Sequence, residues 1–144
     1  MTKRNHSARK GPTAVAARIA RAEAAPRDPL ELAWAAGFFD GEGTAYARAN
    51  RRGHRHLRLT VKQARHPSEV GMPSVLERFR AALQLGAIGG PYADPGNRRP
   101  TYQWYAISSE ALAAAAALWP YLSAVKRDQL AAAIHGLRQD SRVA

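Results

Sequence analysis

Two carboxylates, each followed by glycine, close an apolar stretch in the first third of the chain. In WAAGFFDGEG, residues 34–43, these acids are Asp40 and Glu42. The upstream Asp28-Pro29 predicts a helix start, because aspartate caps helix ends and proline suits the first turn. The two glycines indicate a break of the helix after Asp40, since glycine accepts the backbone conformations of turns. Burying such a helix end is costly unless a cation meets the carboxylates, so we interpret the stretch as a site.

The stretch resembles the LAGLIDADG motif of homing endonucleases, with Ala35 to Gly43 in register with that nine-letter signature. Ala35 stands in place of the usual first leucine and Glu42 in place of the usual second aspartate. The resemblance implies that Glu42 and the Gly41 carbonyl bind Mg2+, with Mn2+ or Ca2+ able to substitute in binding. Asp40 is expected to be structural at the motif. The alternative interpretation is a buried helix that runs into a tight turn, with both acids as turn formers.

The positive charge of the chain is concentrated before residue 67. Lys and Arg number 22 against 11 Asp and Glu; residues 1–66 hold 14 basic and 5 acidic side chains, whereas residues 67–144 hold 8 and 6. This asymmetry indicates a polyanionic partner, with nucleic acid ahead of a membrane surface. The absence of cysteine excludes disulfides and thiolate metal sites. No apolar run is long enough to span a bilayer and no signal peptide is present, so we expect a cytoplasmic, nucleoid-associated protein without a membrane partner.

Two regions are expected along the chain. Residues 1–27 are basic, alanine-rich and poor in large apolar side chains, which predicts a flexible tail with a frayed helix over residues 13–25 at most. Such a tail would either add phosphate contacts along DNA or serve only as a solubilising extension. Residues 28–144 are expected to form a single DNA-binding domain.

A β-hairpin with one polar face is predicted directly after the motif. Polar side chains alternate with alanine over residues 44–52 and with apolar side chains over residues 54–63, with Gly53 at the turn. Each strand would span about 30 Å, the length of roughly nine base pairs, so the ribbon can lie along a major groove. Any one of these residues alone would be an ordinary solvated strand residue, but as a set they favour DNA contacts. The candidates are Thr44, Tyr46, Arg48, Asn50, Arg51, Arg52, His54, His56, Arg58, Thr60 and Lys62.

The remainder of the chain predicts another helix and hairpin, followed by two helices. The helix covers residues 73–85 and the strands residues 87–92 and 101–107, with a loop of turn formers over residues 93–99 between them. The aromatic pair Tyr102 and Trp104 is expected in the core. Further candidate DNA contacts lie in the loop and on the opposite face of the last strand: Arg98, Arg99, Thr101, Gln103 and Tyr105.

This order of elements predicts an α+β fold, an αββαββα unit with a four-stranded antiparallel, saddle-shaped sheet and its helices on one face. It is also the order of one LAGLIDADG unit, so the resemblance covers about residues 29–137. Gln63, in the pattern Leu59-x-Val61-x-Gln63, and Lys126 are similar to further family positions. The resemblance implies that Gln63 positions water and that Lys126 stabilises developing negative charge, with Glu42 as the third catalytic residue.

The implied activity is that of a site-specific homing endonuclease of the single-motif, homodimeric type, which hydrolyses phosphodiester bonds of double-stranded DNA with a divalent metal. Because one motif supplies too few carboxylates, two copies are expected to pack through Ala33, Ala36 and Gly37 and to bind a pseudo-palindromic site. Two alternatives stay open: a non-cleaving DNA-binding protein on the same fold, and an RNA-binding maturase whose partner is intron RNA.

Overall fold

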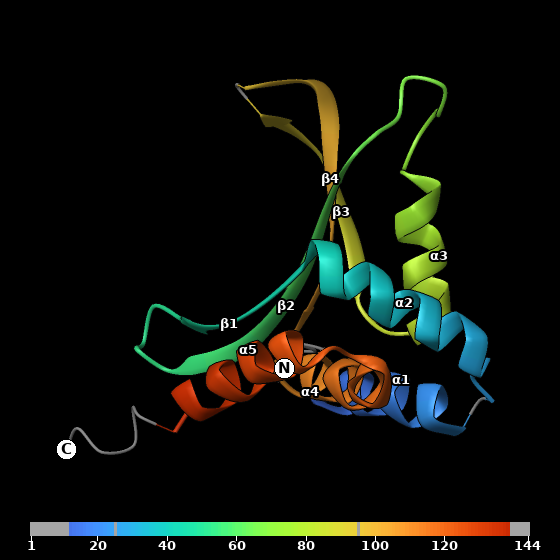
Figure 1. Ribbon diagram of the computed structural model, residues 1–144. Coiled ribbons are helices and arrows are strands. Elements are labelled where there is room, and N and C mark those ends of the chain that lie inside the picture. Colours follow the sequence, from blue (N-terminus) through green and yellow to red (C-terminus); the bar gives the residue numbers. More distant parts are fainter. Residues whose placement is uncertain (1–11, 25, 95, 139–144) are drawn as a thin grey trace, which may run out of the picture.

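The chain folds as one antiparallel sheet with its helices packed on one side (Figure 1). A computed structural model describes residues 12–24, 26–94 and 96–138. The strand order is β1-β2-β4-β3. The predicted α+β fold is thereby confirmed. The elements are α1 (Pro12–Ala24), α2 (Pro29–Glu42), β1 (Gly43–Ala49), β2 (Arg55–Ala64), α3 (Ser74–Leu83), β3 (Ala87–Asp94), β4 (Asn97–Ile107), α4 (Ser108–Leu118), the 3-10 helix η1 (Trp119–Tyr121) and α5 (Ala124–Gly136).

The core lies between the sheet and the helices. Alternate residues of β2 and β4 face the helices, and Val61 and Trp104 are fully buried there. The Phe79 ring of α3 contacts the Trp104 ring edge-on, with centroids 4.8 Å apart, and stacks on Phe39 of α2 at 6.4 Å. Tyr102 is also buried, so the prediction that both aromatics of β4 belong to the core is confirmed.

The motif helix α2 begins as the sequence predicts but ends later. Asp28 caps it, with its Oδ1 accepting a hydrogen bond of 2.9 Å from the Leu30 backbone N–H. The helix then continues through Gly41 to Glu42, so the predicted break after Asp40 is wrong. Gly43 starts β1 with an ordinary φ of −82°. A Cβ on Gly43 would lie 2.2 Å from the Phe39 ring, so close approach is the reason for glycine here.

Helix α1 corrects the prediction of a flexible tail over residues 1–27. Ala22 is 1% exposed, and Ile19 packs against the core, with α4 as the main neighbour of the helix. An alanine-rich surface allows two helices to approach closely, so few large apolar side chains are needed. Residues 1–11 and 25 of that prediction lie outside the described part of the chain.

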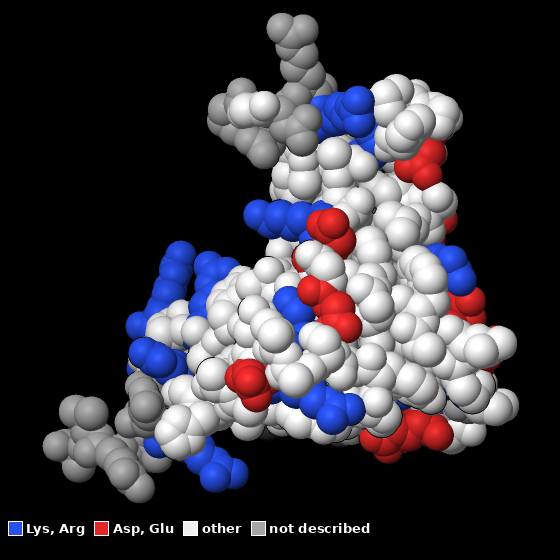
Figure 2. All heavy atoms as spheres, in the orientation of Figure 1, with Lys and Arg blue, Asp and Glu red and all other residues white. Residues whose placement is uncertain are grey.

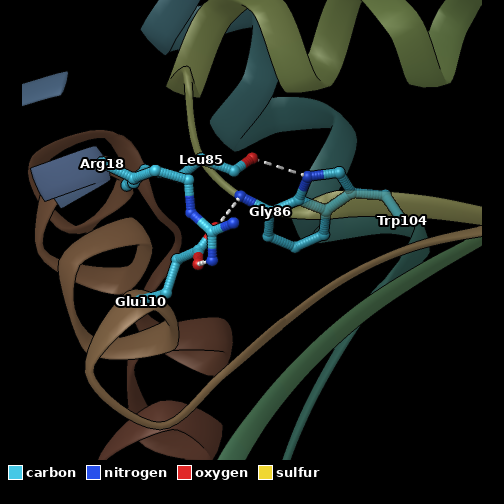
Figure 3. A network of polar contacts seen from close by, with 5 residues as sticks. All are labelled: Arg18, Leu85, Gly86, Trp104 and Glu110. Atoms are coloured by element: carbon cyan, nitrogen blue, oxygen red, sulfur yellow. Dashed lines mark hydrogen bonds and ion pairs between the residues drawn. The ribbon is translucent and has the colours of Figure 1, made fainter. Parts of the chain in front are cut away.

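A polar network ties α1 to the rest of the fold (Figure 3). Arg18 Nη2 lies 2.8 Å from Glu110 Oε2, and the buried Glu110 carboxylate also accepts a hydrogen bond from the Gly86 backbone N–H. Beside it, Trp104 Nε1 donates to the Leu85 carbonyl at 3.0 Å. A single carboxylate of α4 therefore joins α1 to the connection between α3 and β3.

Both hairpin turns differ from the predicted boundaries. β1 ends at Ala49, and the turn that follows is closed by Asn50 Oδ1, which accepts from the backbone N–H groups of Arg52 at 2.9 Å and His54 at 3.1 Å. In the second hairpin, β4 already begins at Asn97, which pairs with Asp94. Arg98 and Arg99 therefore belong to a strand and not to a loop.

Over the described ranges, no helix is long and apolar enough to cross a membrane.

Candidate functional site

One face of the sheet carries no helices (Figure 1). Polar side chains of alternate strand residues lie on this face. The register places Thr44 opposite Thr60, and Lys62 opposite Gln103. Residues paired across strands point to the same face, so three strands contribute to one surface, as the predicted alternation requires. The other polar pairs on this face are Tyr46 with Arg58, Arg48 with His56, and Thr60 with Tyr105.

A groove of about 280 Å³ lies in this face, next to the end of α2. Thr60 is only 6% exposed although it faces away from the helices, whereas Glu42 and Lys62 are exposed. Within the described residues, the Glu42 carboxylate has no hydrogen-bond or salt-bridge partner, so it is open to an incoming cation. The groove thus gathers predicted site residues from four elements: Glu42, Thr44, Tyr46, Thr60, Lys62 and Gln103.

Arg58 is held in a fixed orientation on the same face. Its guanidinium carbon lies 5.2 Å from the centre of the Tyr105 ring. Its Nε is buried and finds no hydrogen-bond partner in the described chain, and the same is true of Thr101 Oγ1. Because an unsatisfied buried donor is costly, this nitrogen has unmet hydrogen-bonding capacity in the described chain.

Positive charge follows the β1–β2 side of the molecule. Figure 2 shows Lys and Arg side chains gathered on the left, over β1 and β2, whereas Asp and Glu lie mainly over the helices. The exposed residues of this region include Arg48 and the turn residues Arg51, Arg52 and His54. The predicted contacts at the turn are therefore exposed near one end of the polar face.

Asp40 does not reach the groove but binds the start of α5. Its Oδ1 and Oδ2 accept hydrogen bonds from the Ser123 backbone N–H, at 3.1 and 3.2 Å, and its Oδ1 accepts from Ser123 Oγ at 3.0 Å. Ser123 in turn caps α5. The structure thus gives Asp40 the structural contacts expected for it, within one chain. Sequence reasoning missed Ser123, although a serine three residues before Lys126 is a typical cap position.

Lys126 is buried behind the end of α2. It is 6% exposed, and its Nζ donates to the Gly43 carbonyl at 2.8 Å and to Gln129 Oε1 at 2.9 Å. The same nitrogen lies 5.6 Å from the centre of the Phe39 ring. The ammonium group thus contacts the residue that directly follows Glu42.

Gln63 is not brought to the groove. It pairs with Tyr102, which is buried on the helix side, and strand alternation places Gln63 on that side too, opposite to Lys62. The pattern Leu59-x-Val61-x-Gln63 indicates the same side, because strand residues two apart share a face and Leu59 and Val61 are both buried in the core.

The described residues of one chain do not complete a metal site. They contain no group of three His, Cys, Asp or Glu that could hold an ion. The exposed Glu42 carboxylate and the Gly41 carbonyl are hard oxygen donors of the kind that Mg2+ prefers. The donor type fits Mg2+.

Helix α2 carries an open stripe of small residues. Ala33, Gly37 and Gly41 are exposed at four-residue spacing, and a Cβ added at either glycine would meet no atom within 4 Å. Ala36, by contrast, is 0% exposed. The prediction of Ala36 at a dimer interface is wrong, because it shares the inward helix face with Phe39.

Comparison with known proteins finds similarity in the fold. Neither a protein-family model nor a curated protein sequence matches the chain. Among solved structures, the LAGLIDADG meganuclease I-AabMI bound to uncleaved DNA matches with a TM-score of 0.56 and 17% sequence identity. The match covers 77% of this chain but 36% of the meganuclease chain, so this chain spans about a third of that protein's length. The resemblance seen in the motif is confirmed at the level of the fold: the chain has the fold of a LAGLIDADG meganuclease.

Proposed function

We propose that the protein is a site-specific DNA endonuclease, which cuts double-stranded DNA as a homodimer with Mg2+. The observation that carries this proposal is the groove in which Glu42 lies beside Lys62 and Gln103 on the open sheet face. A carboxylate able to hold a metal ion, next to side chains that bind phosphates and base edges, is the combination that DNA hydrolysis requires. The fold supports the proposal, because the meganuclease that it resembles is bound to DNA.

The polar sheet face would read the DNA. β2 has ten residues and spans about 33 Å, which suits a two-stranded ribbon in a major groove. Lys62, Gln103 and Arg58 would contact base edges, and the exposed Arg51 and Arg52 of the turn would contact phosphates.

Glu42 and the Gly41 carbonyl would hold Mg2+, and Mn2+ or Ca2+ would replace it in binding. The bound ion would supply Lewis-acid chemistry at the scissile phosphate. Lys126, held on the Gly43 carbonyl, would add positive charge at the end of α2 and so help to stabilise the negative charge that develops on the leaving oxygen. Gln63 takes no part in this proposal, because it faces the helices.

Homodimer formation would complete the site. The stripe of Ala33 and Gly37 lets two α2 helices approach closely, and Leu30, which is 78% exposed, would be covered by the partner. A twofold axis along this stripe brings two copies of Glu42 together and sets two polar sheet faces along one duplex. The target is then a pseudo-palindrome.

Selection from random duplex DNA tests this function. Sites are selected by binding in Ca2+, sequenced, and then exposed to Mg2+. We expect two inverted half-sites and cleavage of both strands. Glu42→Gln should bind the selected site with unchanged affinity and fail to cut it, whereas the matched control Glu77→Gln, an exposed carboxylate on α3, should cut normally. Cleavage by Glu42→Gln at the wild-type rate would overturn the assignment of Glu42.

A non-cleaving DNA-binding protein is the second candidate function. It is favoured by the single carboxylate of the groove and by the absence of a three-ligand cluster in the described residues. Binding of the selected duplex without cleavage in Mg2+ or Mn2+ would select this candidate. Preference for structured intron RNA over the selected duplex would instead favour a maturase.

A further inference from the structure

We infer that Asp40 and Ser123 are positioning residues, which clamp the first turn of α5 to the end of α2 and so hold the Lys126 ammonium group on the carbonyl of Gly43, the residue after Glu42. The contacts concern the fold of one chain, whereas their consequence for cleavage rests on the proposed function. Lysine labelling tests the contacts, and the cleavage rate tests their consequence.

The clamp begins with Asp40, the motif carboxylate that does not line the groove. Both carboxylate oxygens of Asp40 accept from the Ser123 backbone N–H. Its Oδ1 also accepts from the Ser123 hydroxyl group. The Ser123 hydroxyl oxygen also accepts from the Lys126 backbone N–H at 3.3 Å. Ser123 therefore links the Asp40 carboxylate of α2 to the Lys126 backbone.

A second contact holds the same turn from the opposite direction. Arg127 Nε donates to the Trp119 carbonyl at 2.9 Å, and its Nη2 donates to the Pro120 carbonyl at 3.1 Å. The turn before α5 is thereby fixed to its first residues. With both contacts in place, the first turn of α5 has little freedom to rotate, and Lys126 points toward Gly43.

The surroundings of Lys126 indicate a task beyond packing. Its nitrogen has two uncharged oxygen partners and the face of Phe39, and among the described residues no carboxylate lies within salt-bridge distance. Keeping a cation buried without a carboxylate partner is costly. The carbonyl end of α2 offsets part of this cost, because a helix C-terminus carries partial negative charge. If the proposed function holds, the remaining positive charge acts at the Gly43 end of α2, one residue from Glu42 along the chain.

Amine labelling tests the clamp without any need for DNA. The chain has four lysines, and the exposed Lys62 provides an internal reference. Reductive methylation with formaldehyde and borane, followed by mass spectrometry, gives a rate for each. In the wild-type protein we expect Lys126 to react at least about tenfold more slowly than Lys62. In Asp40→Ala and Ser123→Ala the two rates should approach each other.

Two matched variants control for general destabilisation. Ser123→Thr keeps the hydroxyl group and should keep Lys126 slow. Glu31→Gln removes a hydrogen-bonded carboxylate at the other end of α2 and should also keep it slow. If Asp40→Ala fails to fold, the comparison of Ser123→Ala with Ser123→Thr decides alone. If Lys126 is still methylated slowly in folded Asp40→Ala or Ser123→Ala, the inference that Asp40 and Ser123 position it is wrong.

Cleavage of a selected duplex gives the second readout. The clamp predicts that Ser123→Ala lowers the single-turnover cleavage rate by about tenfold or more while the Kd for DNA stays unchanged. A rate equal to that of Ser123→Thr would overturn the link between clamp and cleavage. If the wild-type protein binds but never cuts, the proposed function fails, and the labelling rates still decide whether Asp40 and Ser123 position Lys126.

Discussion

At the scale of single residues, Gly43 is the point where the motif helix becomes β1 and where the Phe39 ring leaves no room for a side chain. A Cβ there would lie 2.2 Å from the ring, whereas one on Gly41 would meet nothing within 4 Å. We predict that Gly43→Ala lowers the free energy of unfolding by about 1–3 kcal/mol, because an overpacked core must shift. Gly41→Ala should instead raise it by up to about 1 kcal/mol, because alanine favours the helix. Urea denaturation measures both, and equal effects would contradict the packing argument.

Single residues also show which parts of the site the sequence predicts correctly. Glu42 and the alternating residues Thr44 and Lys62 meet in the groove because strand alternation is fixed by sequence once the strand is known. Ala36 was misplaced, because small residues at four-residue spacing occur on both the buried and the open side of α2. Gln63 lies on the helix side of the sheet, as its two-residue spacing from Leu59 and Val61 implies.

At the scale of elements, the attachment of α1 depends on Glu110. This buried carboxylate accepts from the Gly86 backbone and pairs with Arg18, whose side chain is 52% exposed. We predict that Glu110→Ala lowers the free energy of unfolding by about 1–3 kcal/mol, because the Gly86 N–H loses its partner. Arg18→Ala should cost about 0–1 kcal/mol, since half-exposed ion pairs contribute little. Equal losses in urea denaturation would show that the ion pair, and not the backbone contact, is the main contribution.

The contact between α2 and α3 makes stability depend on pH. Arg78 donates to both Glu31 oxygens, at 3.0 and 2.8 Å, and these hydrogen bonds hold the pKa of Glu31 below its usual range. A carboxyl group with a lowered pKa in the folded state stabilises that state above its unfolded pKa and loses the effect as pH falls through the folded pKa. We therefore predict that Glu31→Gln is less stable than wild type at pH 7, and that the difference shrinks as pH falls below the ordinary glutamate pKa of about 4.3 and is lost below the lowered pKa of the folded state. Thermal unfolding across this range measures it, and a difference that persists in acid would contradict the hydrogen-bond origin.

The order of elements from α2 to α5 was predictable, because each carries a clear apolar period or turn signal. Helix α1 was not, because its contact with α4 depends on alanine surfaces and on one ion pair between residues 92 positions apart. The start of β4 was missed because pairing of Asp94 with Asn97 overrides the turn-forming composition of the segment. Tertiary contacts decided both cases.

At the scale of the whole molecule, the proposed cleavage of both DNA strands requires two copies of the chain that meet along α2. We predict that Gly37→Leu leaves the fold unchanged, since the space around Gly37 is open, but converts dimers to monomers because the leucine keeps the helices apart. Ala131→Leu, at an exposed position of α5, is the matched control and should remain dimeric. Sedimentation velocity measures this, and a dimeric Gly37→Leu would show that the interface lies elsewhere.

The central claim, that this fold cuts DNA through Glu42, is tested most directly by single-turnover cleavage of a selected duplex labelled on both strands. With Mg2+, the account predicts that the wild-type protein cuts both strands and that a chelator abolishes cutting. It predicts for Glu42→Gln a cleavage rate lower by about a hundredfold or more at unchanged DNA affinity. Cleavage by Glu42→Gln at the wild-type rate, or a tightly bound duplex that the wild-type protein leaves intact in Mg2+, would contradict the claim.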